Sequence, residues 1–109
     1  MSAINKITEA LVNFRNERDW KQFHNAKDLA IAINVEASEL LQLFLWKDAK
    51  EPKDEKIKEE LADVLAFAFL LAHEKRFDVE EIILNKLKIN AEKYPVEKAK
   101  GNAKKYNEL

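Results

Sequence analysis

The sequence predicts an all-α protein, a helical bundle of about four helices that is completed by oligomerisation. Only one Gly and two Pro occur among 109 residues, too few for an all-β chain that must turn every 8–12 residues or so. Apolar residues recur at three- and four-residue steps, the spacing of an amphipathic helix. The hydrophobic fraction of 47% is too high for a disordered chain.

The first helix is predicted from about Ala3 to Arg18, because Ile4, Ile7, Leu11 and Phe14 share one helical face. Residues 19–24 break this period and are predicted to be a connection.

A second helix is predicted from Ala26 to Trp46. Asn25 and Asp28 have the spacing of a capping box at its start. Residues 40–46 are apolar on nearly every side, and a helix of that kind is buried on every side. In so short a chain, this pattern predicts burial against another subunit.

The charged stretch 47–53, which contains Pro52, is predicted to be a loop, followed by a third helix from Asp54 to Lys75. A fourth helix is predicted from Val79 to Lys93.

Asp78 and Glu81 form a second capping-box candidate at the start of the fourth helix, and Pro95 ends it. Residues 96–109 form a basic tail, and residues 1–109 are expected to make a single domain.

Composition also limits function. The formal net charge of −1 disfavours a duplex nucleic-acid partner, and no apolar run is long enough to span a membrane. The chain has no Cys, which excludes thiolate chemistry. The amino-terminal residues lack the apolar core of a signal peptide, so a cytoplasmic location is expected.

The third helix carries an unusual carboxylate. Asp63 is the only charged residue between positions 61 and 72, so it is expected to be flanked by core. Burying an unpaired carboxylate costs several kcal/mol, roughly, even after relaxation. Glu60 lies one turn earlier on the same face, and it adds a like charge instead of a partner.

Glu36 and Glu39 repeat the arrangement on the second helix, again with no Lys or Arg three or four residues away. Two such helices are expected to pair as an antiparallel hairpin. Four facing carboxylates must either take up protons or bind a hard cation, and an all-oxygen set favours Mg²⁺ or Mn²⁺. The alternative is that these residues are half-exposed carboxylates on helix faces, or that they pair with lysines from elsewhere in the chain.

A di-iron centre of the ferritin type is excluded. Such bundles need Glu-x-x-His on two helices, but Leu70 stands three residues before His73 and Lys21 three before His24.

Glu36-x-x-Glu39, 20 intervening residues and Glu60-x-x-Asp63 together resemble the ExxE…ExxD signature of the all-α nucleoside triphosphate pyrophosphohydrolases of the MazG-like superfamily. The resemblance extends to the dCTP pyrophosphatase-like branch. It covers the chain from about Phe14 onward and includes the segments Arg18–His24, Glu39–Lys47, Glu59–Leu65, Tyr94–Pro95 and Lys105–Leu109.

The resemblance implies a Mg²⁺-dependent enzyme that hydrolyses a (deoxy)nucleoside triphosphate, dCTP-like or non-standard, to the monophosphate and pyrophosphate. Such an enzyme would clean the nucleotide pool as a homodimer or tetramer. It places the catalytic and metal-binding roles on Glu36, Glu39, Glu60 and Asp63. It places substrate binding on Trp20, His24 and Trp46, which would form a base and sugar pocket, and on Lys86 and Asn90 of the last helix.

Tyr94 continues the stripe of Lys86 and Asn90 at four-residue steps and is included with them. The stripe has a second interpretation, a solvated helix face. Because a triphosphate brings about four negative charges to four carboxylates, more than one Mg²⁺ is expected.

This chain departs from the family pattern in two places. Val35 stands where many members have an additional Glu, and Lys93 stands where this branch often has Arg. Two other functions stay open: a non-catalytic helical interaction module, and a related enzyme for another pyrophosphate-linked nucleotide, such as a phosphoribosyl nucleotide.

Overall fold

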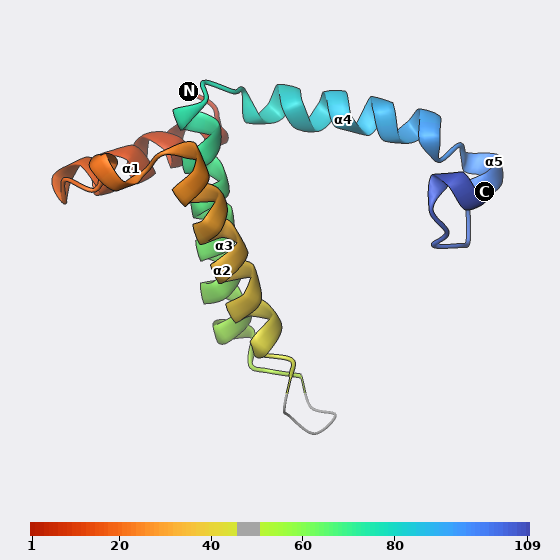
Figure 1. Ribbon diagram of the computed structural model, residues 1–109, viewed down its shortest axis with the longest axis horizontal. Helices are drawn as coiled ribbons and strands as arrows, with labels where there is room; N and C mark the ends of the chain where they lie inside the picture. Colours follow the sequence, from red (N-terminus) through yellow and green to blue (C-terminus); the bar gives the residue numbers. More distant parts are fainter. Residues whose placement is uncertain (46–50) are drawn as a thin grey trace. The chain divides into compact units, whose positions relative to one another are not determined.

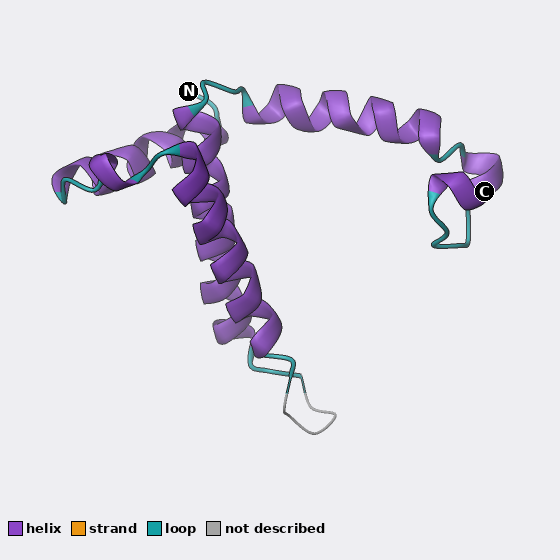
Figure 2. Cartoon of the chain, in the orientation of Figure 1, coloured by secondary structure: helices purple, strands orange, loops and turns teal. Residues whose placement is uncertain are grey.

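The computed structural model describes residues 1–45 and 51–109, and within these residues the chain is helical with no strand (Figures 1 and 2). This confirms the all-α class. The chain divides into two compact units, Met1–Phe77 and Asp78–Leu109, and each is described by itself. The elements in order are α1 (Ala3–Glu17), η1 (Lys21–Phe23), α2 (Ala26–Gln42), α3 (Asp54–Glu74), α4 (Val79–Lys93), α5 (Val96–Ala99) and η2 (Tyr106–Glu108).

Side-chain caps begin three of the helices. The side-chain oxygen of Asn25 accepts from the Asp28 N–H at 2.8 Å, and that of Asp78 accepts from the Glu81 N–H at 2.9 Å. Both predicted helix starts are therefore confirmed, because each cap satisfies an amide that the first turn leaves free. At the start of α1, Ser2 does the same for the third residue of the helix.

The ends of α1 and α3 share a second kind of cap. Asp19 (φ 55°) and Arg76 (φ 59°) are left-handed, and the next residue donates its N–H back across the last turn. Trp20 N bonds to the carbonyl of Arg15 at 3.0 Å, and Phe77 N bonds to that of Ala72 at 2.8 Å. This is the Schellman pattern, which turns the chain sharply at both ends.

The prediction for the end of the second helix was wrong. α2 ends at Gln42 and is followed by turns, because the N–H of Phe44 bonds to the carbonyl of Leu41 three residues back. Apolar spacing does not encode where the hydrogen-bond pattern changes. Leu41 and Phe44 are also 57% and 47% exposed in the single chain, so this chain alone does not bury the run. Trp46 lies outside the described residues.

The first unit is built on the pair α2 and α3, which lie side by side and run in opposite directions (Figure 1). Leu29 is 1% exposed, and Leu70 and Ala72 are 5% and 6% exposed. These buried side chains lie near the start of α2 and the end of α3, where α1 also contacts α3. The well-buried core is therefore at one end of the hairpin.

The second unit contains α4 and the tail. α4 spans the predicted residues and ends before Pro95, as expected. The basic tail forms the short helices α5 and η2, and the ring of Tyr106 packs edge-on against Tyr94 with centroids 6.3 Å apart. No helix in the described ranges is long and apolar enough to cross a membrane.

Candidate metal and nucleotide site

The α2–α3 hairpin brings together carboxylates that lie far apart in the sequence. One oxygen from each of Glu36, Glu60 and Asp63 lies within 4.8 Å of the other two. Glu36 is supplied by α2, and Glu60 and Asp63 by successive turns of α3. The antiparallel packing that the sequence predicts thus gathers three of the four expected carboxylates in one cluster, called the acidic cluster below.

Glu39, the fourth carboxylate, lies at the edge of the acidic cluster. Its carboxylate raises the pKa of both Glu36 and Glu60, through hydrogen bonding and through its charge. Glu39 therefore acts on the cluster although it is not one of the three residues whose oxygens lie within 4.8 Å of one another.

The carboxylates are less buried than the sequence suggests. Asp63 and Glu39 are exposed, and Glu36 and Glu60 are half-buried. This corrects the expectation that Asp63 is flanked by core: a two-helix hairpin covers only the side of each helix that faces the other. Burial is concentrated on single atoms, because Oε2 of Glu36 and Oε2 of Glu60 are buried and have no hydrogen-bond partner within the described ranges.

Crowding of like charges shifts the protonation of the cluster. Hydrogen bonding with Glu39, then burial, then the negative charges of Glu39, Asp63 and Glu60 raise the pKa of Glu36 to about 7. Burial and the charge of Glu39 likewise raise the pKa of Glu60. The residues described here provide no ion pair to any of the four carboxylates; the ion pairs of the first unit join Arg15 to Glu74, Lys56 to Glu59 and Lys58 to Glu55.

These features fit a hard divalent cation. The donors are all carboxylate oxygens, and Oε2 of Glu36 and Oε2 of Glu60 are buried without a hydrogen-bond partner among the described residues. A bound cation would displace the protons that the raised pKa values of Glu36 and Glu60 favour. Glu36, Glu60 and Asp63 are the residues that would hold it, with Glu39 beside them.

Two predicted pocket residues lie in the connection between α1 and α2. His24 is half-buried, and its ring packs edge-on against Phe67 with centroids 6.3 Å apart. Phe67 follows Asp63 by one helical turn, so His24 lies near the acidic cluster along α3. Trp20 is 44% exposed and packs edge-on against Phe14 at 5.8 Å, which leaves part of its indole open for contact.

The remaining predicted substrate residues that the structure describes belong to the second unit. Lys86 and Asn90 occupy successive turns of α4 and Tyr94 caps its end, all in the second unit. Lys86 is exposed, whereas Asn90 and Tyr94 are half-buried. Their roles, like those of the acidic cluster, stay predictions.

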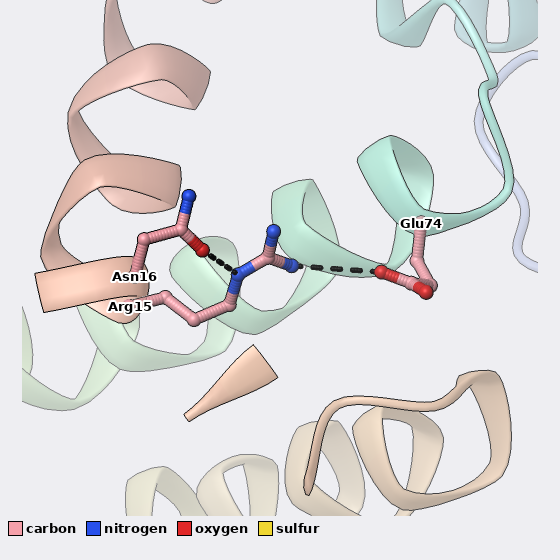
Figure 3. Close-up of polar contacts among 3 residues, drawn as sticks. All are labelled: Arg15, Asn16 and Glu74. Atoms are coloured by element: carbon pink, nitrogen blue, oxygen red, sulfur yellow. Dashed lines mark hydrogen bonds and ion pairs between the residues drawn. The ribbon is translucent and has the colours of Figure 1, made fainter. Parts of the chain in front are cut away.

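The sequence analysis missed Arg15, which is only 3% exposed. Its Nη1 lies 3.5 Å from Oε2 of Glu74, and its Nε donates to the side chain of Asn16 at 3.3 Å (Figure 3). The available signal was its position four residues after Leu11, on the apolar face of the first helix.

The chain is all-α and carries facing carboxylate pairs on a helical hairpin. Comparison with known proteins identifies the class of protein that shares these features. A model of the MazG-like family matches residues 31–109. The dCTP pyrophosphatase 1 proteins of Bos taurus and Homo sapiens are each 38% identical to this chain in alignments of 104 residues that cover 88% of it. A pyrophosphatase from Archaeoglobus fulgidus has a similar structure, with a TM-score of 0.80 and 29% identity over 87% of this chain and 94% of its own.

The chain belongs to the MazG-like family. It spans only 62% and 61% of the length of the bovine and human relatives.

Proposed function

We propose that this protein is a nucleoside triphosphate pyrophosphohydrolase that converts a (deoxy)nucleoside triphosphate to its monophosphate and pyrophosphate. The observation that carries the proposal is the acidic cluster, with oxygens of Glu36, Glu60 and Asp63 within 4.8 Å of one another. Membership of the MazG-like family and similarity to proteins named dCTP pyrophosphatase support it. The proposed substrate is dCTP-like or non-standard, and the proposed role is cleaning of the nucleotide pool.

The cluster's own residues define its part in the reaction. Glu36, Glu60 and Asp63 would hold Mg²⁺, with Mn²⁺ as a substitute and more than one ion when substrate is bound. The metal, when bound, supplies positive charge to the phosphate oxygens and lowers the pKa of coordinated water. One of the four carboxylates is proposed to accept a proton from the attacking water, with Glu39 beside the three that would hold the metal.

We propose that His24, Trp20 and Trp46 contact the base and sugar of the nucleotide. The His24 imidazole packs against Phe67, and Phe67 lies one helical turn of α3 from Asp63. Trp20 offers a partly exposed indole face, suited to stacking on a base. Lys86, Asn90 and Tyr94 are proposed to contact the nucleotide phosphates.

The deciding experiment incubates the protein with each of the four common dNTPs, the four NTPs and modified cytosine triphosphates, with and without Mg²⁺. Monophosphate and pyrophosphate in equal amounts, formed only with Mg²⁺ or Mn²⁺, are expected. Release of orthophosphate would overturn the proposal. If folded, metal-loaded protein turns over no triphosphate, the next assay uses phosphoribosyl-linked nucleotides, and inactivity there favours a non-catalytic module.

We further propose that the active form is a homodimer or a tetramer. Three large apolar side chains near the end of α2 are exposed in the single chain: Leu41 (57%), Phe44 (47%) and Leu45 (40%). Burial of apolar surface is the main driving force of such association. Sedimentation at several concentrations tests it, and a monomer at high micromolar concentration would contradict it.

A further inference from the structure

Arg15 of α1 is the buried charged residue of the first unit, and its environment is incomplete. The 3.5 Å separation from Glu74 is an ion pair, but it lacks hydrogen-bond alignment, so Nη1 is buried without a hydrogen-bond partner within the described ranges. A buried guanidinium N–H without an acceptor costs free energy. The structure therefore leaves one donor of Arg15 in need of an acceptor.

His24 also has a buried polar atom without a hydrogen-bond partner in the part of the chain that the structure describes. Its Nδ1 is also buried and has no hydrogen-bond partner among the residues described. Burial lowers the pKa of His24, the charge of Arg15 lowers it further, and the charge of Glu74 opposes them. The two charges thus act on the imidazole from different helices, α1 and α3.

The two atoms are chemically complementary. A guanidinium N–H can only donate, whereas Nδ1 of a neutral imidazole accepts when the proton is on Nε2. The two atoms are not bonded to each other directly, but a water that bridges them satisfies both. It also fixes the tautomer and leaves Nε2–H as a donor on the other side of the ring.

Arg15 also holds the other predicted pocket residue. Its carbonyl accepts the N–H of Trp20 at 3.0 Å, in the cap that ends α1. Arg15 is thus tied to α3 through Glu74 (Figure 3), bonded to Trp20 through its backbone carbonyl, and near enough to His24 for its charge to lower the pKa of the imidazole.

We propose that Arg15 is a positioning residue that holds His24, through a bridging water, as a neutral imidazole with its proton on Nε2 for contact with the nucleotide. The role in substrate contact rests on the proposed function. The state of His24 itself does not.

The first test is NMR titration of His24 with long-range ¹H–¹⁵N correlation, which identifies the tautomer and needs no substrate. We expect Nε2–H in the wild type. Arg15→Met is expected to raise the pKa of His24, because a positive charge is removed, and Glu74→Gln is expected to lower it. Lys56→Met, which breaks the exposed Lys56–Glu59 pair, is the control and is expected to leave it unchanged.

The second test is steady-state kinetics. Arg15→Met is expected to raise the KM for the nucleotide about tenfold with a smaller change in kcat, and Arg15→Lys is expected to restore part of the loss. If Arg15→Met does not fold, Arg15→Lys and Glu74→Gln carry both tests. The proposal is overturned if His24 has its proton on Nδ1, or if its pKa moves in the same direction or not at all in the two variants.

The two proposals fail in different ways. A wild-type protein that hydrolyses no triphosphate contradicts the proposed function, while the titration still decides the state of His24. An active wild type whose KM is unchanged by Arg15→Met contradicts the positioning role alone.

Discussion

The imidazole of His24 packs edge-on against the ring of Phe67, with centroids 6.3 Å apart and planes at 70°. Phe67 follows Asp63 by four residues on α3, so one face of this helix carries both a carboxylate of the acidic cluster and the support of the imidazole. The candidate metal site and the candidate base and sugar pocket are therefore built on the same helix.

Asp63→Asn is expected to abolish pyrophosphate release, because an amide cannot supply the negative charge that holds a divalent cation. The same change is expected to leave the metal-free protein folded and at least as stable, since it removes one of several crowded like charges. Activity assays and thermal melts check both parts. Glu59→Gln, which removes an exposed carboxylate next to Glu60, is the matched control; unfolding of Asp63→Asn would show a structural role instead.

Divalent cations are expected to raise the melting temperature of the wild type. An ion that binds only the folded state at 100 times its Kd adds about 2.7 kcal/mol to the free energy of unfolding. Glu60→Gln is expected to lose most of this gain because it removes one carboxylate of the cluster, and Glu59→Gln is expected to keep it. A gain of equal size in both variants would contradict a metal site at the cluster.

The stability of the metal-free protein is expected to fall as the pH rises from about 4.3 to the raised pKa of Glu36, about 7. A carboxyl whose pKa is higher in the folded state binds more protons there than in the unfolded chain, so stability decreases with pH across this window. Glu36→Gln is expected to remove much of the dependence, and the raised pKa of Glu60 is expected to keep the rest.

With allowance for screening by water, the gain from Glu36→Gln is expected to be about 1 kcal/mol at pH 8 and close to zero at pH 4. Urea denaturation at the two pH values in the presence of a chelator measures it. A gain that is the same at both values would show that charge crowding is not its cause.

Leu70→Ala is expected to lower the free energy of unfolding by about 2–4 kcal/mol, because it opens a cavity in the buried end of the first unit. Leu70 is 5% exposed, whereas Leu61 on the same helix is 44% exposed. Leu61→Ala is therefore the control, with a smaller expected loss. Equal losses in chemical denaturation would show that a partner surface, and not this core, buries Leu61 as well.

Arg76→Gly is expected to stabilise the protein by up to about 1 kcal/mol. Arg76 caps α3 with φ 59°, a conformation that costs an L-residue about 1–2 kcal/mol and glycine very little, while the greater freedom of glycine in the unfolded chain offsets part of the gain. Thermal melting measures the change, and a large loss would indicate that the Arg76 side chain contributes contacts of its own.

The sequence by itself determined the helices, because apolar period and capping act within a few residues of one another. It also determined the pairs Glu36–Glu39 and Glu60–Asp63, each one turn apart on its helix. It did not determine where α2 ends, since apolar residues continue past Gln42. The choice between a helical turn and a bend there depends on hydrogen bonds that side-chain type does not specify.

Only the tertiary structure decided how the two pairs meet. The register of α2 against α3 places Glu36 with Glu60 and Asp63 and leaves Glu39 at the edge, and register follows from packing of side chains far apart in the sequence. The same holds for Arg15 and Glu74, which are 59 residues apart (74 − 15) and lie 3.5 Å from each other. A charge on an apolar helix face predicts that a partner is needed, but only the packed helices determine which residue provides it.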